Sequence, residues 1–230
     1  MSGHRFAFHG MALEALPSGA LWWPEGRWLV VADLHLGKSE RMARRGGPLL
    51  PPYEGLATLA RLAEDAARLR PATIVSLGDG FDDLAAVAAL DPAVVEGIAA
   101  LARDRDWIWI GGNHDPGRPQ GVPGRGAEEL MLGPVTLRHA AVAGAGPDIS
   151  GHYHPVVRLA GERRRAFLLG SDHLLLPAYG AYTGGLASDD PALKALVPSG
   201  LAIACGRGTT LLPLVAREGR RSRGRRPWIR

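Results

Sequence analysis

Residues 72–83 read ATIVSLGDGFDD, and the way this stretch divides decides the fold. Its first half is a short apolar run with β-branched residues, which predicts a buried strand. Its second half places two glycines and three carboxylates where that strand ends. Loops at the carboxyl ends of parallel strands commonly hold active sites. The stretch therefore predicts one strand of an α/β protein that leads into a polar site.

The segments on either side of this stretch alternate between strand and helix patterns. Arg27–Ala32 and Trp107–Ile110 are apolar runs of strand length, whereas Tyr53–Leu69 has apolar residues at helical spacing. Asp91-Pro92 provides an N-cap and a first-turn proline for a helix that runs to about Asp104. This order predicts a parallel-type sheet with crossover helices.

The chain beyond residue 120 contains mainly short strand-like runs, from Leu130–Leu132 to Thr210–Leu214. So many strands require a second sheet or an extension of the first. We therefore expect an α/β fold in which two β-sheets pack face to face with helices outside, as one domain over residues 1–216. Residues 217–230 are rich in arginine, and we expect this tail to be disordered.

Cysteine content and hydropathy predict a location in the cytoplasm. Cys205 is the only cysteine, so no intrachain disulfide can form, and a reducing compartment suits the chain. Because Cys205 follows an apolar run, we expect it to be a small core residue. No run approaches 18 apolar residues, and the N-terminus lacks the pattern of a signal peptide. We expect neither export nor a membrane span.

The basic charge of the chain is concentrated in its tail. Residues 217–230 hold seven arginines and one acid, whereas residues 1–216 have a net charge of −2. The tail suits binding to nucleic-acid phosphates, but it could equally be a solubilising end. The charge alone therefore leaves the partner open.

Five short motifs follow predicted strands and carry the chemistry. Each is weak alone, but their order and placement together make chance improbable. They are Asp33-x-His35, Gly78-Asp79-x-x-Asp82, Gly112-Asn113-His114-Asp115, the single His139, and Gly151-His152-Tyr153-His154. Carboxylate, imidazole and amide groups are ligands for Mn²⁺, Fe, Zn²⁺ or Ni²⁺. The absence of cysteine from the five motifs disfavours a structural zinc site. The motifs predict a site for two divalent metal ions that share one carboxylate.

These motifs resemble the signature of the calcineurin-like metallophosphoesterase superfamily in order and spacing, over residues 33–154. The resemblance implies an αββα sandwich of two mixed sheets flanked by helices. It also implies two ligand sets, with Asp79 as the bridge between them. The first set is Asp33, His35, Asp79 and His154. The second set is Asp79, Asn113, His139 and His152.

The same resemblance implies catalytic roles beside the metals. His114 follows the ligand Asn113, so we expect it to act as a general acid towards the leaving oxygen, with Asp115 orienting its ring. Lys38 is either a contact to a substrate phosphate or a solvated surface lysine. His173 is expected to support the site or the fold from outside the ligand set.

A closer resemblance points to a DNA nuclease. Residues 33–38, DLHLGK, and residues 174–186 are similar to the DNA-ligase-associated phosphoesterases of the PdeM family. The second motif departs from that family's pattern, which has histidine before its last aspartate, so the roles of Asp82 and Asp83 stay open.

This closer resemblance implies a Mn²⁺-dependent phosphodiesterase that cleaves DNA in repair, with metal-activated water attacking phosphorus in line. DNA ligase or helicase proteins are the partners it suggests. The alternatives are a small-molecule phosphatase, a cyclic-nucleotide phosphodiesterase, and a scaffold without catalysis. The metal motifs are common to all the enzymes of this group, so they do not separate these substrates.

Overall fold

The computed structural model describes residues 2–47, 53–115 and 118–215, and it contains two mixed β-sheets. The first sheet has seven strands that follow one another in sequence order. They are β1 (His4–Phe8), β2 (Met11–Ala15), β3 (Leu21–Trp23), β4 (Trp28–Val31), β5 (Thr73–Leu77), β6 (Asp106–Ile110) and β7 (Arg125–Ala127). Strands β1 to β4 pair antiparallel, and β4 to β7 pair parallel.

The second sheet has eight strands and contains its own short parallel unit. The strands are β8 (Leu130–Leu132), β9 (Val135–Arg138), β10 (Asp148–Ser150), β11 (Val156–Leu159), β12 (Glu162–Leu169), β13 (His173–Leu175), β14 (Gly200–Ala204) and β15 (Thr210–Leu214). Strand β10 lies between β9 and β13 and is parallel to both, whereas the other pairs are antiparallel. Parallel strands in both sheets therefore deliver loops from their carboxyl ends.

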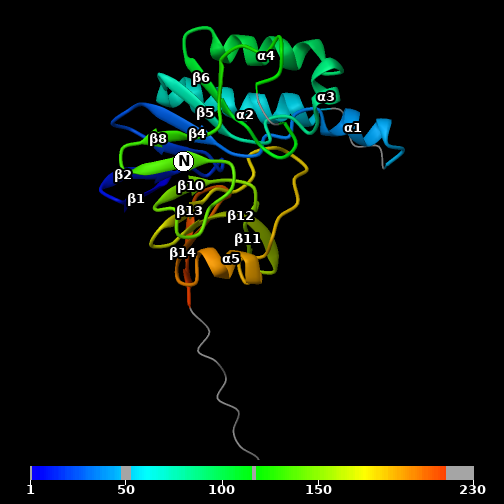
Figure 1. The fold of residues 1–230 in the computed structure, drawn as a ribbon. Coiled ribbons are helices and arrows are strands. Elements are labelled where there is room, and N and C mark those ends of the chain that lie inside the picture. The colour runs from blue at the N-terminus through cyan, green and yellow to red at the C-terminus, as the bar shows by residue number, and fades with distance from the viewer. Residues whose placement is uncertain (1, 48–52, 116–117, 216–230) are drawn as a thin grey trace, which may run out of the picture.

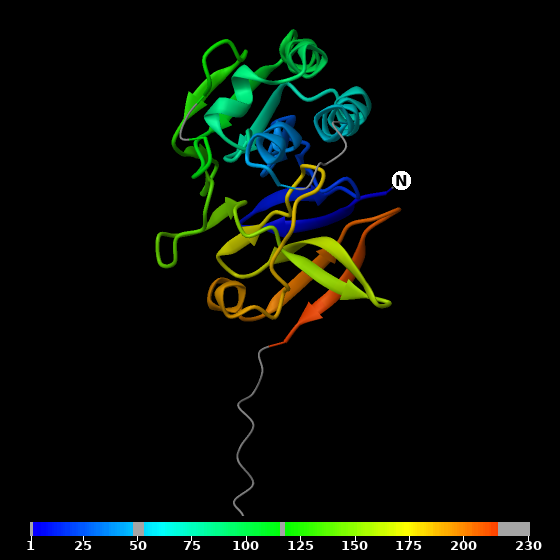
Figure 2. The same ribbon diagram turned by 90° about the vertical axis from the view of Figure 1, so that its right-hand side faces the viewer.

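The two sheets stack with helices on the outside, as Figures 1 and 2 show. Buried side chains from both sheets form the central core, among them Leu13, Val75, Ile108, Ile149 and Phe167. The helices are α1 (Lys38–Arg44), α2 (Glu54–Leu69), α3 (Leu84–Ala88), α4 (Pro92–Ala102) and α5 (Pro191–Leu196). This arrangement confirms the predicted αββα sandwich.

The two outer layers differ in thickness. Helices α2 and α4 cover the first sheet through a large apolar cluster that includes Leu62, Ile98 and Trp107. The smaller cluster on the outer side of the second sheet includes Leu193 and Val197 from α5 and the residue after it. Helix α5 has only six residues. The second sheet therefore depends more on its contact with the first sheet than on helix cover.

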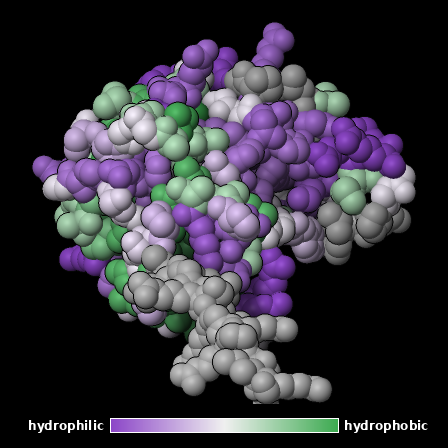
Figure 3. Space-filling model, turned by 60° about the horizontal axis from the view of Figure 1, so that its bottom comes forward, coloured by the Kyte–Doolittle hydropathy of each residue, from purple (hydrophilic) through white to green (hydrophobic). Residues whose placement is uncertain are grey.

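Several sequence expectations concern regions away from the site. Cys205 is buried, as predicted, and its burial raises the pKa of the thiol to about 12. The predicted tail lies outside the described residues, so its disorder and the domain limit at residue 216 stay predictions. No helix in the described part of the chain is long and apolar enough to cross a membrane. On the face in Figure 3, hydrophilic and hydrophobic residues are intermixed.

Candidate metal centre

The structure brings all seven predicted metal ligands to one place between the sheets. Loops after β4, β5 and β6 carry the donors from the first sheet, and loops after β9 and β10 carry those from the second. The donors are Asp33, His35, Asp79, Asn113, His139, His152 and His154. Their side-chain atoms fall into two clusters on either side of the Asp79 carboxylate.

The first cluster joins Asp33, His35 and His154, whose donor atoms all lie within 4.8 Å of one another. His154 Nε2 is 3.3 Å from Asp33 Oδ1 and 3.4 Å from His35 Nε2. Two imidazole nitrogens and a carboxylate oxygen thus converge on one point. Neutral imidazole nitrogens gain nothing from facing each other through their lone pairs, whereas a cation between them would be bound by both.

The second cluster joins Asp79, Asn113, His139 and His152. His139 Nε2 lies 2.9 Å from Asn113 Oδ1 and 3.5 Å from Asp79 Oδ2. His152 Nδ1 lies 3.1 Å from both His139 Nε2 and Asn113 Oδ1. This set of oxygen and imidazole donors fits Mn²⁺, Fe or Zn²⁺ better than Ca²⁺ or Mg²⁺, which prefer oxygen alone.

Asp79 lies close to histidines of both clusters. Its Oδ2 is 3.5 Å from His139 Nε2 in one cluster and 4.0 Å from His35 Nε2 in the other. Its Oδ1 accepts a hydrogen bond from the backbone N–H of His114 at 2.9 Å. That hydrogen bond fixes the carboxylate so that Oδ2 faces both clusters. Asp79 is thus the donor shared between the two groups.

The motif glycines provide the space in which these side chains sit. A Cβ atom added to Gly112 would lie 2.2 Å from Asp79 Oδ1, and one added to Gly151 would lie 2.4 Å from Asp33 Oδ2. At Gly78 it would lie 2.3 Å from His139 Nδ1. Any other residue at these three positions would displace a donor. The glycines of the second, third and fifth motifs are therefore packing requirements of the centre.

Hydrogen bonds away from the clusters set which nitrogen of two histidines faces inward. The backbone carbonyl of Leu77 can only accept, so His139 Nδ1, 3.0 Å away, carries the proton and Nε2 presents a lone pair. His35 Nδ1 lies 3.0 Å from Asp82 Oδ1, which leaves His35 Nε2 for the first cluster. The pKa of His152 is lowered by burial and by the neighbouring His139. The neutral, metal-binding form of His152 is thereby favoured.

The position of Asp82 shows its role, which the second motif left open together with that of Asp83. It is almost fully buried and lies between His35 Nδ1 and Arg41 Nε, which is 2.9 Å from Asp82 Oδ2. The contact with His35 lowers the pKa of Asp82 against the opposing effect of burial. Asp83 points elsewhere and pairs with Arg44 at 2.7 Å. Asp82 therefore orients a donor histidine, and Asp83 contacts helix α1.

His114 lies beside the centre, but its ring is held by Asp82 and not, as we had expected, by Asp115. Its Nδ1 is 2.8 Å from the backbone carbonyl of Asp82, and its ring centroid is 5.2 Å from that of His35. The Asp115 carboxylate instead accepts a hydrogen bond from the Phe81 N–H at 3.0 Å. The expectation that Asp115 orients His114 is thus corrected, because neighbouring residues in this turn face different ways. Burial raises the pKa of Asp115 to about 7.

A cleft of about 530 Å³ lies over the centre, and two cationic side chains line it. Lys38 and Arg41 are three residues apart on α1, so they share one face of that helix. The buried Glu54 accepts hydrogen bonds from the backbone N–H and hydroxyl of Ser39, which fixes the start of α1. Sequence reasoning missed Arg41, although its spacing from Lys38 was a usable signal.

His173 belongs to the second sheet and not to the centre. Its Nδ1 lies 3.0 Å from Asp148 Oδ1, and Asp148 Oδ2 accepts the Val142 N–H. Both residues of this pair are buried. His173 therefore supports the fold, which is one of the two roles that the sequence left open.

Comparison with known proteins agrees with this geometry. Residues 26–168 match the family model described as calcineurin-like phosphoesterase. The chain is similar to the crystal structure of a Pseudomonas putida nuclease, MPE, with 30% identity, a TM-score of 0.72, and coverage of 93% of this chain and 100% of that one. Yfce, a phosphoesterase from E. coli, matches at 16% identity and a TM-score of 0.37, over 78% of this chain and 88% of that one.

No curated protein sequence matches significantly. The match to the family model nevertheless covers more than half of the chain and includes all five motifs. The family is one of metal-dependent phosphoester hydrolases, and the converging donors are those that divalent metals need. The chain therefore belongs to the calcineurin-like phosphoesterase family.

Proposed function

We propose that this protein is a Mn²⁺-dependent phosphodiesterase that cleaves DNA. The observation that carries the proposal is the pair of donor clusters that share Asp79 beneath a cleft lined by cations. Two bound divalent cations would lower the pKa of water and neutralise the charge on the phosphoryl oxygens. The similarity to a bacterial nuclease over nearly the whole chain favours DNA as the substrate.

The two clusters would divide the donors as the family resemblance implied. Asp33, His35 and His154 would hold one cation, and Asn113, His139 and His152 the other, with Asp79 between them. Mn²⁺ suits a mixed set of carboxylate, amide and imidazole groups, although Fe, Zn²⁺ and Ni²⁺ suit it too. Metal analysis of the purified protein decides among them.

His114 is the residue best placed to protonate the leaving group. The backbone carbonyl of Asp82 accepts a hydrogen bond from Nδ1–H, so Nε2 is the nitrogen left to exchange a proton with the substrate. Water attacks phosphorus and releases a proton to solvent, and the bond from phosphorus to the leaving oxygen breaks. The doubly protonated ring of His114 donates its Nε2 proton to that oxygen and is reprotonated from solvent. The products are a phosphate monoester and a free hydroxyl.

Lys38 and Arg41 extend the positive region along the cleft. Arg41 also contacts the Asp82 carboxylate, so part of its charge is neutralised, whereas Lys38 is the freer cation for a phosphate next to the scissile one. A chain of phosphates gains from several such contacts, whereas a single monoester needs only the metals. This arrangement favours a polynucleotide over a small ester. Roles in DNA repair, beside a ligase or helicase, rest on the family resemblance alone.

The test compares substrates on the Mn²⁺-loaded protein. Single-stranded DNA, double-stranded DNA, bis-p-nitrophenyl phosphate and p-nitrophenyl phosphate are assayed beside Asp79→Asn and the surface control Asp172→Asn. We expect cleavage of DNA and the diester that Asp79→Asn abolishes and Asp172→Asn retains. Turnover of the monoester alone would replace the proposal with a small-molecule phosphatase. Inactivity on every substrate with two metals bound would indicate a scaffold.

A further inference from the structure

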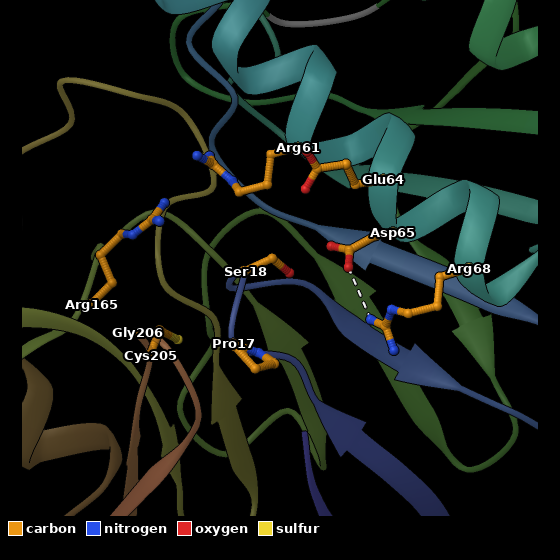
Figure 4. Close-up of a pocket in the computed structure, with 9 residues that line it drawn as sticks. All are labelled: Pro17, Ser18, Arg61, Glu64, Asp65, Arg68, Arg165, Cys205 and Gly206. Atoms are coloured by element: carbon orange, nitrogen blue, oxygen red, sulfur yellow. Dashed lines mark hydrogen bonds and ion pairs between the residues drawn. The ribbon is translucent and has the colours of Figure 1, made fainter. Parts of the chain in front are cut away.

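A second hollow of about 420 Å³ lies between α2 and the second sheet, and its lining shares no residue with that of the cleft above the metal centre. Figure 4 shows Arg61, Glu64, Asp65 and Arg68 entering it from α2. Arg165 enters from β12, on the opposite side. Pro17, Ser18, Cys205 and Gly206 complete the lining. The hollow therefore combines a mainly apolar surface with three arginines and two acids.

Two of its arginines lie side by side without an acidic partner. Arg61 and Arg165 extend toward each other in Figure 4. Both donate to the backbone carbonyl of Tyr179, with Arg165 Nη1 at 3.2 Å from that oxygen and 3.1 Å from the carbonyl of Ala178. Among the described residues, neither guanidinium forms an ion pair, and the buried Arg61 Nε has no hydrogen-bond partner. Two full positive charges thus face one hollow.

The acids of the hollow do not offset this pair. Asp65 is engaged by Arg68 at 3.0 Å and by the Tyr179 hydroxyl at 3.2 Å. Glu64 is exposed at the rim of the hollow, and among the described residues it forms no ion pair with Arg61 or Arg165. The pKa of Arg165 is lowered by burial and by the neighbouring charge of Arg61. Arg61 also lies over the Tyr179 ring, with its Cζ 4.4 Å from the ring centroid. Because an arginine stays protonated in proteins, an anion bound between the two guanidinium groups would offset their mutual repulsion.

We propose that this hollow is a binding site for a phosphate group, separate from the metal centre. Arginine forks match the oxygens of a phosphate, and two of them converging from different elements can hold it from two sides. The Ser18 hydroxyl accepts from the Ala20 N–H at 3.3 Å, so its own proton is available for a third contact. The volume of the hollow accommodates inorganic phosphate or a small phosphate ester.

The bound phosphate would also brace the metal centre from behind. The backbone N–H groups of Tyr179 and Gly180 donate to the carbonyls of Ala32 and Asp33 at 2.7 and 3.1 Å. Arg61 and Arg165 hold the carbonyl of the same Tyr179. Neutralising the guanidinium pair therefore strengthens a segment that packs directly on the Asp33 backbone.

Calorimetric titration of the metal-loaded protein with inorganic phosphate tests the proposal. We expect two binding events, because the metals also bind phosphate. Arg61→Gln or Arg165→Gln should weaken one event by about 10- to 100-fold, as loss of a charge-assisted hydrogen bond does. The control Arg103→Gln, which removes an exposed arginine outside the hollow, should leave both events unchanged. A single event that both arginine substitutions leave intact would overturn the proposal.

A second variant keeps both arginines and guards against loss of folding. Glu64→Gln removes a negative charge from the rim, so phosphate should bind about two- to fivefold more tightly to the same event. Glu128→Gln, at an exposed position outside the hollow, is its matched control. Repeating the titration with AMP shows whether the hollow prefers a free phosphate ion or a phosphate ester. The preferred form is the one that binds more tightly. Equal affinity in the Glu64→Gln and Glu128→Gln variants would contradict the proposal.

Discussion

The two sheets contribute different chemistry to the metal centre. The first sheet supplies all of its oxygen donors and one imidazole, whereas the second sheet supplies imidazoles only. The oxygen donors are Asp33, Asp79 and Asn113, and the imidazoles of the second sheet are His139, His152 and His154. The two carboxylates lie at the base, with side chains 0% and 4% exposed, whereas the His154 side chain is 18% exposed at the rim.

The base also connects the two sheets. Asp33 accepts the backbone N–H of His152 at 2.9 Å, so a carboxylate from the first sheet fixes the loop that carries two imidazoles of the second. Asp79 fixes the backbone of His114 in the same way. The imidazoles of the second sheet instead contact other donors through their ring nitrogens, as His139 and His152 do with Asn113 Oδ1. Changes at the base should therefore affect the whole centre, and changes at the rim only one cluster.

The largest expected effect comes from the donor common to both clusters. Asp79→Asn weakens the attraction for both cations, so we expect a fall of about 10³-fold or more in phosphodiester cleavage, equivalent to about 4 kcal/mol. His152→Ala removes a donor from one cluster only, and metal analysis by mass spectrometry should find one of the two ions retained. Equal metal loss in the two variants would remove the distinction between base and rim.

His114→Ala tests a residue that acts beside the centre without belonging to either donor set. We expect kcat to fall by about 10²–10⁴-fold with metal content unchanged. The loss should be smaller for bis-p-nitrophenyl phosphate than for DNA, because p-nitrophenolate leaves without protonation. His9→Ala, in the turn that follows β1, serves as the control. An equal loss on both substrates would exclude His114 as the proton donor.

Asp82→Asn tests whether Asp82 acts only by orienting the donor His35. His35 would lose its charged partner while keeping its own nitrogen in the cluster, so metal affinity should fall by about 10- to 100-fold. Excess Mn²⁺ should restore most of the activity. Asp83→Asn changes the neighbouring carboxylate, which pairs with Arg44, and should leave metal affinity unchanged. Activity that excess metal fails to restore would assign Asp82 a direct part in the reaction.

The smallest effect is expected at the cleft wall. Lys38→Gln should raise KM for DNA several-fold with little change in kcat, and the slope of log affinity against log salt should fall by about one. Lys194 is the only other lysine, so Lys194→Gln is a matched control. An unchanged KM and salt slope would identify Lys38 as a solvated surface residue, the second of its two interpretations.

The sequence predicted which residues the structure brings together, because each of them lies just after the end of a strand. Apolar runs such as Ala72–Leu77 are visible without tertiary knowledge, and the motif residues follow them directly. Strand β2 was missed because its buried residues alternate with less buried ones instead of forming an apolar run. The charged first half of β12 was missed because its residues are exposed or only partly buried. Helices α1, α3 and α5 were missed because five to seven residues give too few turns for a periodic pattern.

Contacts between distant segments could not be predicted in the same way. The choice between Asp82 and Asp83 depends on where His35 lies, and adjacency in sequence wrongly suggested a contact between Asp115 and His114. Arg61 and Arg165 are far apart in the chain, so no spacing rule links them. Such contacts are fixed only by how segments that are distant in sequence pack together in the fold.

The backbone of the metal centre has a consequence for how this fold can change over generations. Five donor residues adopt left-handed backbone conformations that glycine tolerates far better: Asp33, His35, Asp79, His152 and His154, with φ between 45° and 70°. Each such residue costs free energy that only metal binding justifies. If selection for hydrolysis ceased, glycine at these positions would remove that backbone cost. A lineage that keeps all five side chains is therefore one in which the reaction is still under selection.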